Sequence, residues 1–429
     1  MDEVSRLEVS DEPVQLVERV AALDLGKASL TACVRVPHEE RPGQRRQDIR
    51  EYSTLSRSLL ELADWLRRER IELVAMEATS SYWKPVFYLL EAEGFTCWLL
   101  NAKHVKNVPG RPKTDKIDAV WLAKVVEWGL CSPSLVHPKP IRQLRDLTRY
   151  RRSLIRERTR EKQRVEKLLE DAQIKLSSVI SDVFGVSGRE MLEALIAGQR
   201  SPKTLARMAR GSMRAKTEVL QEALTGHFED HHGFLLRSML AHIDYLTAQI
   251  DDVGTRVEVV IAPFVPAAAR LDEIIGVGLT GAQELIAEIG VDATRFPTPA
   301  HLVSWAKFAP IDKNSAGKKR GGSTGKGNPW LASTLGEVVA GLSRTDTFLG
   351  ERYRRLARRR GKKRAIVALG NSILTIVWHL LADPEAHYYD LGADYHHNNI
   401  NARRRERELV RQLERLTGKK VSLEPVEAA

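Results

Sequence analysis

Residues 19–27 read Arg-Val-Ala-Ala-Leu-Asp-Leu-Gly-Lys, an apolar run that contains Asp24 near its end and is closed by Gly26. Buried β-strands have such a composition, and an acid before glycine is common in turns. A second apolar run at 29–36 follows at once, so we expect two strands joined by a turn at Gly26. Asp24 alone could be a structural turn residue, and its interpretation depends on whether other acids accompany it.

Three further acids occupy comparable positions. Glu77 ends the apolar run 71–77, where a carboxylate at the edge of a core has to be paired or bound to a metal. Asp115 and Asp118 follow Thr114, which can cap a helix, and their spacing of three places both on one helix face. Asp115 could instead be a first-turn acid favoured by the helix dipole. Together the four carboxylates suit Mg²⁺ or Mn²⁺, and two such ions commonly serve phosphodiester cleavage and joining.

The composition favours a polyanionic partner. The chain has 429 residues, of which 67 are Lys or Arg, and a net charge of +11. A nucleic acid is the expected partner of such a chain, and a basic protein without one is the alternative. Three cysteines without metal-binding spacing indicate a reducing cytoplasm, and the acidic, polar N-terminus does not read as a signal peptide. Since no segment approaches the ~18 apolar residues of a membrane span, we expect no membrane partner.

The N-terminal part alternates strands and helices after a polar extension at 1–17. Strands are expected at 17–25, 29–36, 71–76 and 95–100, helices at 55–70, 82–94 and 115–128, and a charged hairpin loop at 39–47. Strand–turn–strand followed by strand–helix alternation, with acids at strand ends, predicts a ribonuclease-H-like α/β fold. Residues 18–130 are therefore expected to form a metal-dependent catalytic domain.

The middle part, 139–262, is expected to form long basic helices that resemble a coiled coil. Residues 139–170 hold 12 Lys or Arg against 5 Asp or Glu, and charged residues interrupt their apolar stripe. A helix at 235–260 could fold back antiparallel on the first. A solvated helical linker is the alternative, because charged helix faces usually contact water. We expect nucleic-acid contacts from three arginines of the first helix, Arg151, Arg152 and Arg156.

The C-terminal part, 268–395, is expected to be a helical domain that handles phosphates, followed by a charged tail at 396–429. Two helices joined by Gly276-Val277-Gly278 look like a helix–hairpin–helix, whose backbone N–H groups can seat a phosphate. The loop 314–328 is basic and rich in glycine, which suits phosphate handling, although it is not a Walker A loop. We expect nucleic-acid contacts at Gly276, Gly278, Lys318, Lys319, Arg320 and Lys326, and at Arg111 and Lys113 beside the acids.

Several motifs resemble the DEDD transposases of bacterial insertion sequences, the one-ten family. The N-terminal matches are Leu-Asp-Leu-Gly-Lys at 23–27, Met-Glu-Ala-Thr-Ser-Ser-Tyr-Trp at 76–83 and Gly-Arg-Pro-Lys-Thr-Asp-Lys-Ile-Asp-Ala at 110–119. The C-terminal matches run from Ile-Gly-Val-Gly at 275–278 through Trp-Ala-Lys-Phe-Ala-Pro at 305–310 to a basic segment that ends at Ala368. The resemblance covers residues 18–395 and implies a RuvC-like N-terminal domain and a C-terminal transposase domain.

The resemblance also implies a mechanism. Asp24, Glu77, Asp115 and Asp118 match the family's metal-binding acids, and Ser315 matches the serine that attacks a DNA phosphate. Ser323 is the alternative nucleophile, because the loop departs from the family pattern around both serines. A serine hydroxyl needs a base or a metal to become reactive. The family further implies a guide RNA, encoded by the element, that pairs with donor and target DNA, so that the protein recognises mainly shape and backbone.

The leading hypothesis is therefore a serine-dependent DNA recombinase of an insertion sequence, guided by RNA and located in the bacterial cytoplasm at the nucleoid. The alternatives are a Holliday-junction resolvase-like nuclease that uses two metals and water, and a nucleic-acid-binding scaffold without enzymatic activity. Because the acids and the serine fall in domains separated by long helices, we expect a homodimer or homotetramer with shared active sites.

Overall fold

A computed structural model describes residues 17–78, 80–101, 115–310, 313–315, 318–320, 323–395 and 402–423. Within these ranges the side chains of 115–117, 313–315, 318–320 and 402–405 are not described. The chain divides between His137 and Pro138 into two compact units, which are taken separately below.

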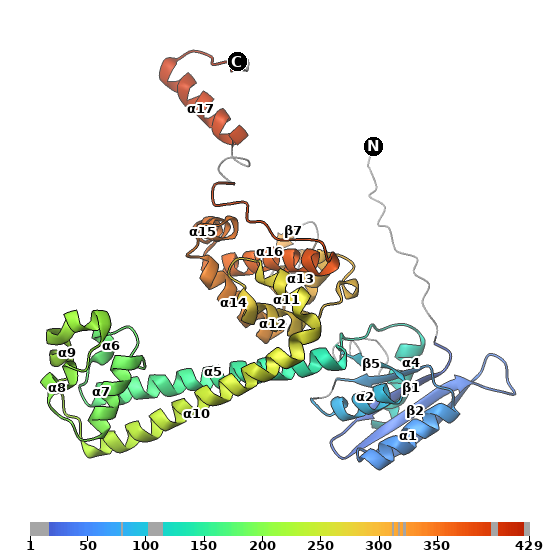
Figure 1. Ribbon diagram of the computed structural model, residues 1–429. Helices are drawn as coiled ribbons and strands as arrows, with labels where there is room; N and C mark the ends of the chain where they lie inside the picture. Colours follow the sequence, from blue (N-terminus) through green and yellow to red (C-terminus); the bar gives the residue numbers. More distant parts are fainter. Residues whose placement is uncertain are drawn as a thin grey trace. The chain divides into compact units, whose positions relative to one another are not determined.

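The N-terminal unit is built on a five-stranded sheet of order β3-β2-β1-β4-β5 (Figure 1). The strands are β1 (Val20–Leu25), β2 (Ser29–Pro37), β3 (Arg45–Ser53), β4 (Leu73–Glu77) and β5 (Thr96–Leu100). β2 is antiparallel to both β1 and β3, whereas β4 runs parallel to β1 and to β5. This order, with three antiparallel strands followed by two parallel ones, is that of a ribonuclease-H-like sheet, so the predicted fold class is confirmed.

Helices cover both faces of the sheet. They are α1 (Ser56–Arg68), α2 (Trp83–Ala92) and α4 (Asp115–Glu127). α1 and α2 pack on one face, in a core that joins Leu23 to Trp65. α4 packs on the other face, in a second core that joins Ala22 to Leu122. Because both faces are covered, β1 and β4 are apolar along nearly their whole length, which is why each could be recognised from the sequence.

The third strand, β3, was not predicted. Residues 39–47 were expected to form a loop, but β3 begins at Arg45 and pairs with β2 along nine residues. It lies at the edge of the sheet and most of its side chains are exposed or partly exposed, so it lacks the apolar alternation that marks a strand. The neighbouring strand, rather than the strand's own composition, determines this element.

The second unit begins with two long helices, α5 (Lys139–Asp171) and α10 (Asp230–Ile261), which lie side by side (Figure 1). The predicted long helix and its return are therefore present. Short helices between them enclose a separate core that includes Leu169, Leu192 and Leu236. These helices are α6 (Leu176–Val179), α7 (Val186–Ile196), α8 (Pro202–Ala206), η1 (Gly211–Lys216) and α9 (Thr217–Ala223).

The C-terminal helices form a layered bundle in which α12 packs against α5. A short antiparallel hairpin, β6 (Lys313–Ser315) and β7 (Lys318–Arg320), interrupts them. The helices of the bundle are η2 (Ala262–Phe264), α11 (Val265–Asp272), α12 (Gly278–Ile289), η3 (Ala293–Arg295), α13 (Pro299–Trp305), α14 (Pro329–Leu342), α15 (Phe348–Arg360) and α16 (Lys362–Ala382). The helix α17 (Ala402–Thr417) follows in the chain.

One described helix, α16, is long and apolar enough to cross a membrane, by length and composition only. This finding corrects the expectation that no segment approaches such a length. Its side chains Leu369, Ile373 and Val377 are buried, and the helix packs against α13, α14 and α15. Packing inside the helical unit therefore accounts for the apolar side chains on its buried face.

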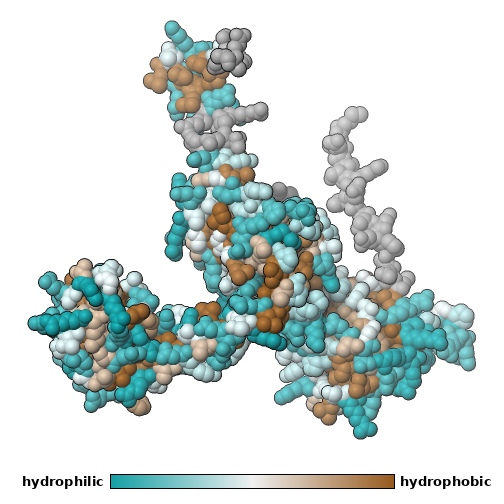
Figure 2. Space-filling view, in the orientation of Figure 1, coloured by the Kyte–Doolittle hydropathy of each residue, from teal (hydrophilic) through white to brown (hydrophobic). Residues whose placement is uncertain are grey.

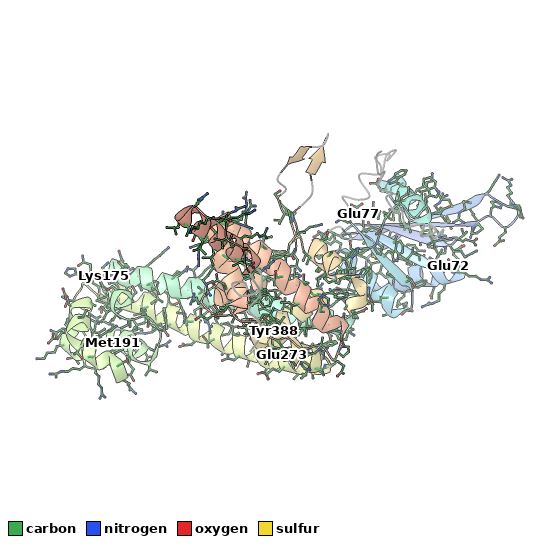
Figure 3. The ribbon with its side chains drawn as sticks, turned by 90° about the horizontal axis from the view of Figure 1, so that it is seen from above. Glu72, Glu77, Lys175, Met191, Glu273 and Tyr388 are labelled. Carbon is green, nitrogen blue, oxygen red and sulfur yellow. The ribbon has the colours of Figure 1, made fainter. Side chains whose placement is uncertain are left out.

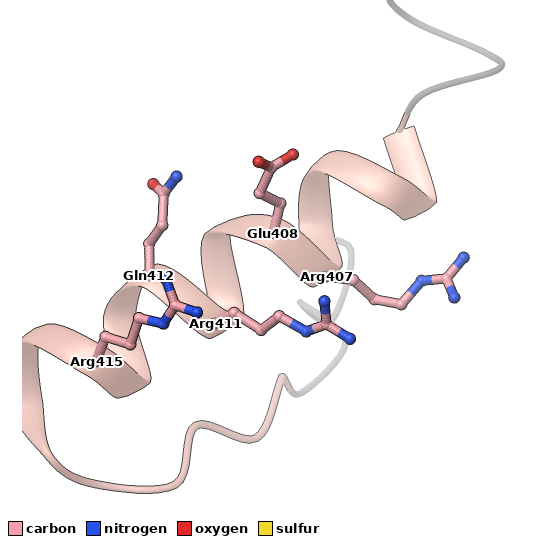
Figure 4. Close-up of a pocket in the computed structure, with 5 residues that line it drawn as sticks. All are labelled: Arg407, Glu408, Arg411, Gln412 and Arg415. Atoms are coloured by element: carbon pink, nitrogen blue, oxygen red, sulfur yellow. The ribbon is translucent and has the colours of Figure 1, made fainter.

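The last helix, α17, is amphipathic. Figure 2 shows apolar side chains gathered on it, and three leucines are exposed there, Leu409, Leu413 and Leu416. A hollow of about 470 Å³ lies along the same helix (Figure 4), lined by Arg407, Glu408, Arg411, Gln412 and Arg415. All of these residues belong to one helix, so this hollow is a surface of α17 rather than an enclosed site.

Candidate active site

Two of the predicted metal ligands lie at neighbouring strand ends. β1 and β4 are parallel, and Leu23 pairs with Met76. The next residue on each strand is an acid, Asp24 and Glu77, so the two carboxylates occupy adjacent positions at one edge of the sheet. Strand alternation places both on the face opposite Leu23, which is the face covered by α4. Both side chains are partly exposed, and Figure 3 shows where Glu77 lies on the sheet.

The helix α4 brings a third acid to this face. Leu122 packs on the sheet, and Asp118, one turn earlier on α4, is partly buried. Asp115 opens the helix, but its side chain lies outside the described part, and Arg111 and Lys113 lie outside it altogether. The structure thus places an acid of α4 over the sheet face that carries the two strand-end acids.

A buried ion-pair cluster that the sequence analysis missed holds the far end of α4. Glu127, the last residue of the helix, accepts a hydrogen bond of 2.6 Å from Arg35 Nε on β2. Arg45 Nε on β3 lies 3.0 Å from its other oxygen, and Arg35 also donates to Gln47 at 2.9 Å. The cluster ties α4 to β2 and β3, and so helps to fix the helix that carries the acids. Arg45 reaches Glu127 only through the pairing of β3, which no local sequence pattern reveals.

The donor chemistry on this face fits Mg²⁺ or Mn²⁺. The candidate ligands are carboxylates, which hard divalent cations prefer. The softer donor in the same core is the Cys33 thiol, and burial raises its pKa to about 12, so it stays protonated. Among the side chains that the structure describes, no three His, Cys, Asp or Glu residues are grouped so that they could hold a metal ion. The side chain of Asp115, the fourth acid, lies outside the described part of the structure.

The predicted nucleophile lies on the β6–β7 hairpin. Ser315 pairs with Lys318 across the hairpin, and an isolated bridge between Pro310 and Thr324 closes its base. Figure 3 shows the two strands standing out from the helices. The side chains of both strands lie outside the description, so the roles of Ser315 and of the three cations of β7 stay predictions.

Two elements were predicted to bind phosphate, the turn at 276–278 and the loop 314–328. Packing explains why some of their residues are glycines. Gly276 has a φ of +89°, and a Cβ there would lie 2.9 Å from Leu342 Cγ, so the turn between α11 and α12 requires glycine. Gly278 has a φ of +64° and opens α12. In the second element, a Cβ at Gly327 would lie 2.5 Å from a backbone oxygen at the end of α13. Lys326 is exposed, as a nucleic-acid contact has to be.

Two of the arginines predicted to contact nucleic acid are buried inside the second unit. Arg151 donates a hydrogen bond of 3.1 Å to Gln283, and Arg152 forms ion pairs of 3.0 Å with Glu284 and 2.6 Å with Glu337. Both arginines are 8% exposed. These contacts hold α5 against α12 and α14, so the expectation for Arg151 and Arg152 is corrected: their charges are used within the protein.

The same network extends along α5. Arg149 donates to both oxygens of Glu288, at 2.7 and 2.8 Å, and Glu288 is only 2% exposed. Asn328, which also caps α14, donates to the same carboxylate. Arg156 differs, because it is exposed and lies 5.2 Å from the ring of Trp330. Of the three predicted arginines, Arg156 alone is placed where a ligand could reach it.

Two family models match the chain. A transposase model of the DEDD IS110 type matches residues 21–174, and the model of the transposase IS116/IS110/IS902 family matches residues 268–354. Together they cover more than half of the chain; the first range contains the four acids and the second contains Ser315. No curated protein matches.

Among solved structures, the chain is similar to T. thermophilus RuvC in complex with Holliday junction substrate. That likeness has 16% identity and a TM-score of 0.20, and it covers 27% of this chain and 99% of that chain. The fold assignment therefore rests on the strand order and directions of the sheet itself.

Proposed function

This chain belongs to the IS110 family of DEDD transposases and is a DNA transposase, and from that premise we propose that Ser315 is its nucleophile. We further propose that Asp24, Glu77, Asp115 and Asp118 bind Mg²⁺ or Mn²⁺. The observation that carries the proposal is the register of β1 and β4, which sets Asp24 beside Glu77 on the face covered by the acid-bearing helix α4.

The four acids would hold the cation at the end of the sheet, and the Glu127 cluster would help to keep α4 in place. When bound, a divalent cation stabilises negative charge on phosphate oxygens and makes a coordinated hydroxyl more acidic. A cation held by partly exposed carboxylates could contact a DNA phosphate at this edge, whereas a cation held by acids deeper in the sheet could not.

The serine step replaces one phosphodiester bond of the DNA by a phosphodiester to the serine, so the bond energy is kept. The Ser315 hydroxyl loses its proton as its oxygen bonds to phosphorus, and the bond from phosphorus to one DNA oxygen breaks. That oxygen takes up a proton and leaves as a free hydroxyl end, while the other DNA end stays joined to the serine. A second DNA hydroxyl can then attack the same phosphorus and release the serine, so strands are exchanged without ATP. The cations of β7 would offset the phosphate charge.

The proposed partners are donor and target DNA and a guide RNA. A guide RNA would select the sequence by base pairing, and the protein would recognise the shape and charge of the paired strands. The acids lie in the first compact unit and Ser315 lies in the second. We propose a homodimer or homotetramer in which the acids of one protomer serve the serine of another.

The test is a denaturing gel that detects a covalent protein–DNA adduct. The protein is incubated with DNA from the ends of its element, co-expressed RNA and Mg²⁺. Wild type should form the adduct, and Ser315→Ala and Asp24→Ala should not. Ser304→Ala, which removes an exposed hydroxyl from α13, is the matched control and should behave as wild type.

Other outcomes would replace parts of the proposal. Loss of the adduct in Ser323→Ala but not in Ser315→Ala would transfer the nucleophile to Ser323. Cleavage without an adduct, equally efficient in Ser315→Ala, would assign the chain a water-dependent nuclease reaction. Activity that persists unchanged at dilutions where the protein is strictly monomeric would exclude shared active sites.

A further inference from the structure

A cavity of about 770 Å³ opens at the base of the hairpin that carries Ser315. It lies between α15 and α16, and it is lined by Thr324, whose bridge to Pro310 closes the hairpin. Cavities of roughly 300–1,000 Å³ accommodate ligands of several rings rather than single ions. Ser323 lines the cavity beside Thr324. None of the described residues that line it is acidic.

Positive charge reaches this cavity from both helices. Arg352, Leu356 and Arg359 lie four and three residues apart, so they share one face of α15. Gly361, with a φ of +84°, then reverses the chain, and the first turn of α16 adds further cations. The N-terminus of this 21-residue helix contributes its own positive dipole end. The lining cations are Arg352, Arg359, Arg360, Lys363 and Arg364.

Arg352 is the residue that most directly indicates an anionic ligand. Its Nε is buried and has no hydrogen-bond partner among the described residues. Burial lowers the pKa of its guanidinium, and the nearby charge of Arg355 lowers it further. Arg354 on the same helix is different, because it pairs with Glu351 at 3.0 Å and donates to Thr345 O at 2.8 Å. A buried donor without an acceptor is costly, and an anion in the cavity would offset that cost.

The floor of the cavity is apolar and well supported. Phe308 packs so closely on α16 that a Cβ at Gly370 would lie 2.4 Å from its ring. Asn371 donates a hydrogen bond of 3.2 Å to the backbone oxygen of Phe308. Leu356 and Val367 belong to the same apolar lining. A free phosphate would leave this floor unused, whereas the sugar and base of an unpaired nucleotide would cover it.

We propose that this cavity binds an unpaired nucleotide of the DNA strand, with its phosphate on the cationic rim and its sugar or base on the apolar floor. This inference rests on the proposed function in one respect, the choice of DNA as the ligand. DNA is chosen because the hairpin at the rim of the cavity carries the proposed nucleophile. The cavity would then hold a strand beside the bond that is cut. A base pair, which is wider and keeps its bases stacked, would not enter it.

The test measures binding of fluorescein-labelled oligonucleotides by anisotropy at several salt concentrations, with single-stranded DNA, the matching duplex and single-stranded RNA. The test variant is Arg359→Gln/Lys363→Gln, because both side chains are exposed and line the cavity. The control is Arg358→Gln, an exposed cation of the same helix turn that does not line it. The assay needs no cleavage, so its result is independent of the adduct experiment.

We expect the double variant to bind single-stranded DNA more weakly, with a salt dependence lowered by about 0.7 for each phosphate that the missing cations no longer neutralise. Duplex binding should change less, and Arg358→Gln should bind as wild type. Equal binding and equal salt dependence in wild type and the double variant would overturn the proposal. A weakening confined to RNA would also overturn it, by reassigning the cavity to the guide strand.

Discussion

Two basic helices of this transposase use their arginines in opposite ways. On α5, Arg149 and Arg152 meet Glu288 and Glu284 of α12 in the interior of the unit. On α15, Arg352 faces a cavity without an acid among its described lining residues. Both helices are densely basic in the sequence, yet Arg149 and Arg152 of α5 join helices, whereas Arg352 of α15 is left open to a ligand.

The contrast teaches that the density of basic residues does not identify a nucleic-acid surface. Arg152 and Glu284 are 132 residues apart, and Arg149 and Glu288 are 139 apart. No local pattern could therefore show that the arginines of α5 are already paired. The useful criterion is whether a cation has an acidic partner once the chain is folded.

The largest expected effect concerns Glu288. Glu288→Ala would remove the buried carboxylate that Arg149 and Asn328 share, and we expect a decrease of about 3–5 kcal/mol in the free energy of unfolding. Urea denaturation followed by tryptophan fluorescence measures it. Glu337→Gln removes an exposed partner of the same network and should cost about 0–1 kcal/mol. An equal loss of unfolding free energy in Glu288→Ala and Glu337→Gln would show that burial does not make the Glu288 pair stronger than the Glu337 pair.

The second prediction separates stability from binding on α5. Arg151→Met removes a buried hydrogen bond to Gln283 and should cost about 1–3 kcal/mol of stability, because it leaves a buried acceptor unpaired. DNA binding by the Arg151→Met variant should have the same salt dependence as DNA binding by wild type. A reduced salt dependence would mean that Arg151 also reaches DNA. It would contradict the conclusion that the buried arginines of α5 serve only the fold.

The third prediction concerns Arg352. Arg352→Gln removes a half-buried guanidinium whose Nε lacks an acceptor among the described residues, so the variant should be as stable as wild type or more stable by about 1 kcal/mol. Inorganic phosphate should raise the Tm of wild type and raise that of the variant less. Thermal melts in phosphate and in chloride of equal ionic strength measure both effects. A Tm gain from phosphate that is the same in both proteins would remove Arg352 from the proposed site.

The smallest effect is expected at an exposed pair. Glu273 accepts a hydrogen bond of 2.9 Å from the backbone N–H of Tyr388 and pairs with His387 at 2.7 Å, near the labels of Figure 3. These contacts lower the pKa of Glu273. A lowered pKa stabilises the fold above the ordinary carboxyl value of 4.5, and the gain disappears as the pH falls through the lowered value. In Glu273→Gln the free energy of unfolding should therefore fall slightly less at acid pH than it does in wild type. The same dependence on pH in both proteins would contradict this prediction.

The parts of the fold that could be predicted are those with their own local signal. β1 and β4 are buried on both faces and read as apolar runs, and α5 carries an apolar stripe along its 33 residues. β3 could not be predicted, because an edge strand with exposed, charged side chains has no apolar alternation. The expectation that no segment approaches the length of a membrane span was wrong for α16, because a helix that packs in a bundle can carry a long run of apolar residues.

By itself the sequence indicated four candidate acids from residue type and local spacing, and its resemblance to the family added Ser315 as the predicted nucleophile. It also determined the alternation of strands and helices that predicts the sheet. Only the tertiary structure decided that Asp24 and Glu77 are neighbours, that Glu127 anchors α4, and which arginines are paired. Those facts depend on strand register and on helix packing between residues far apart in the chain, and no local pattern encodes them.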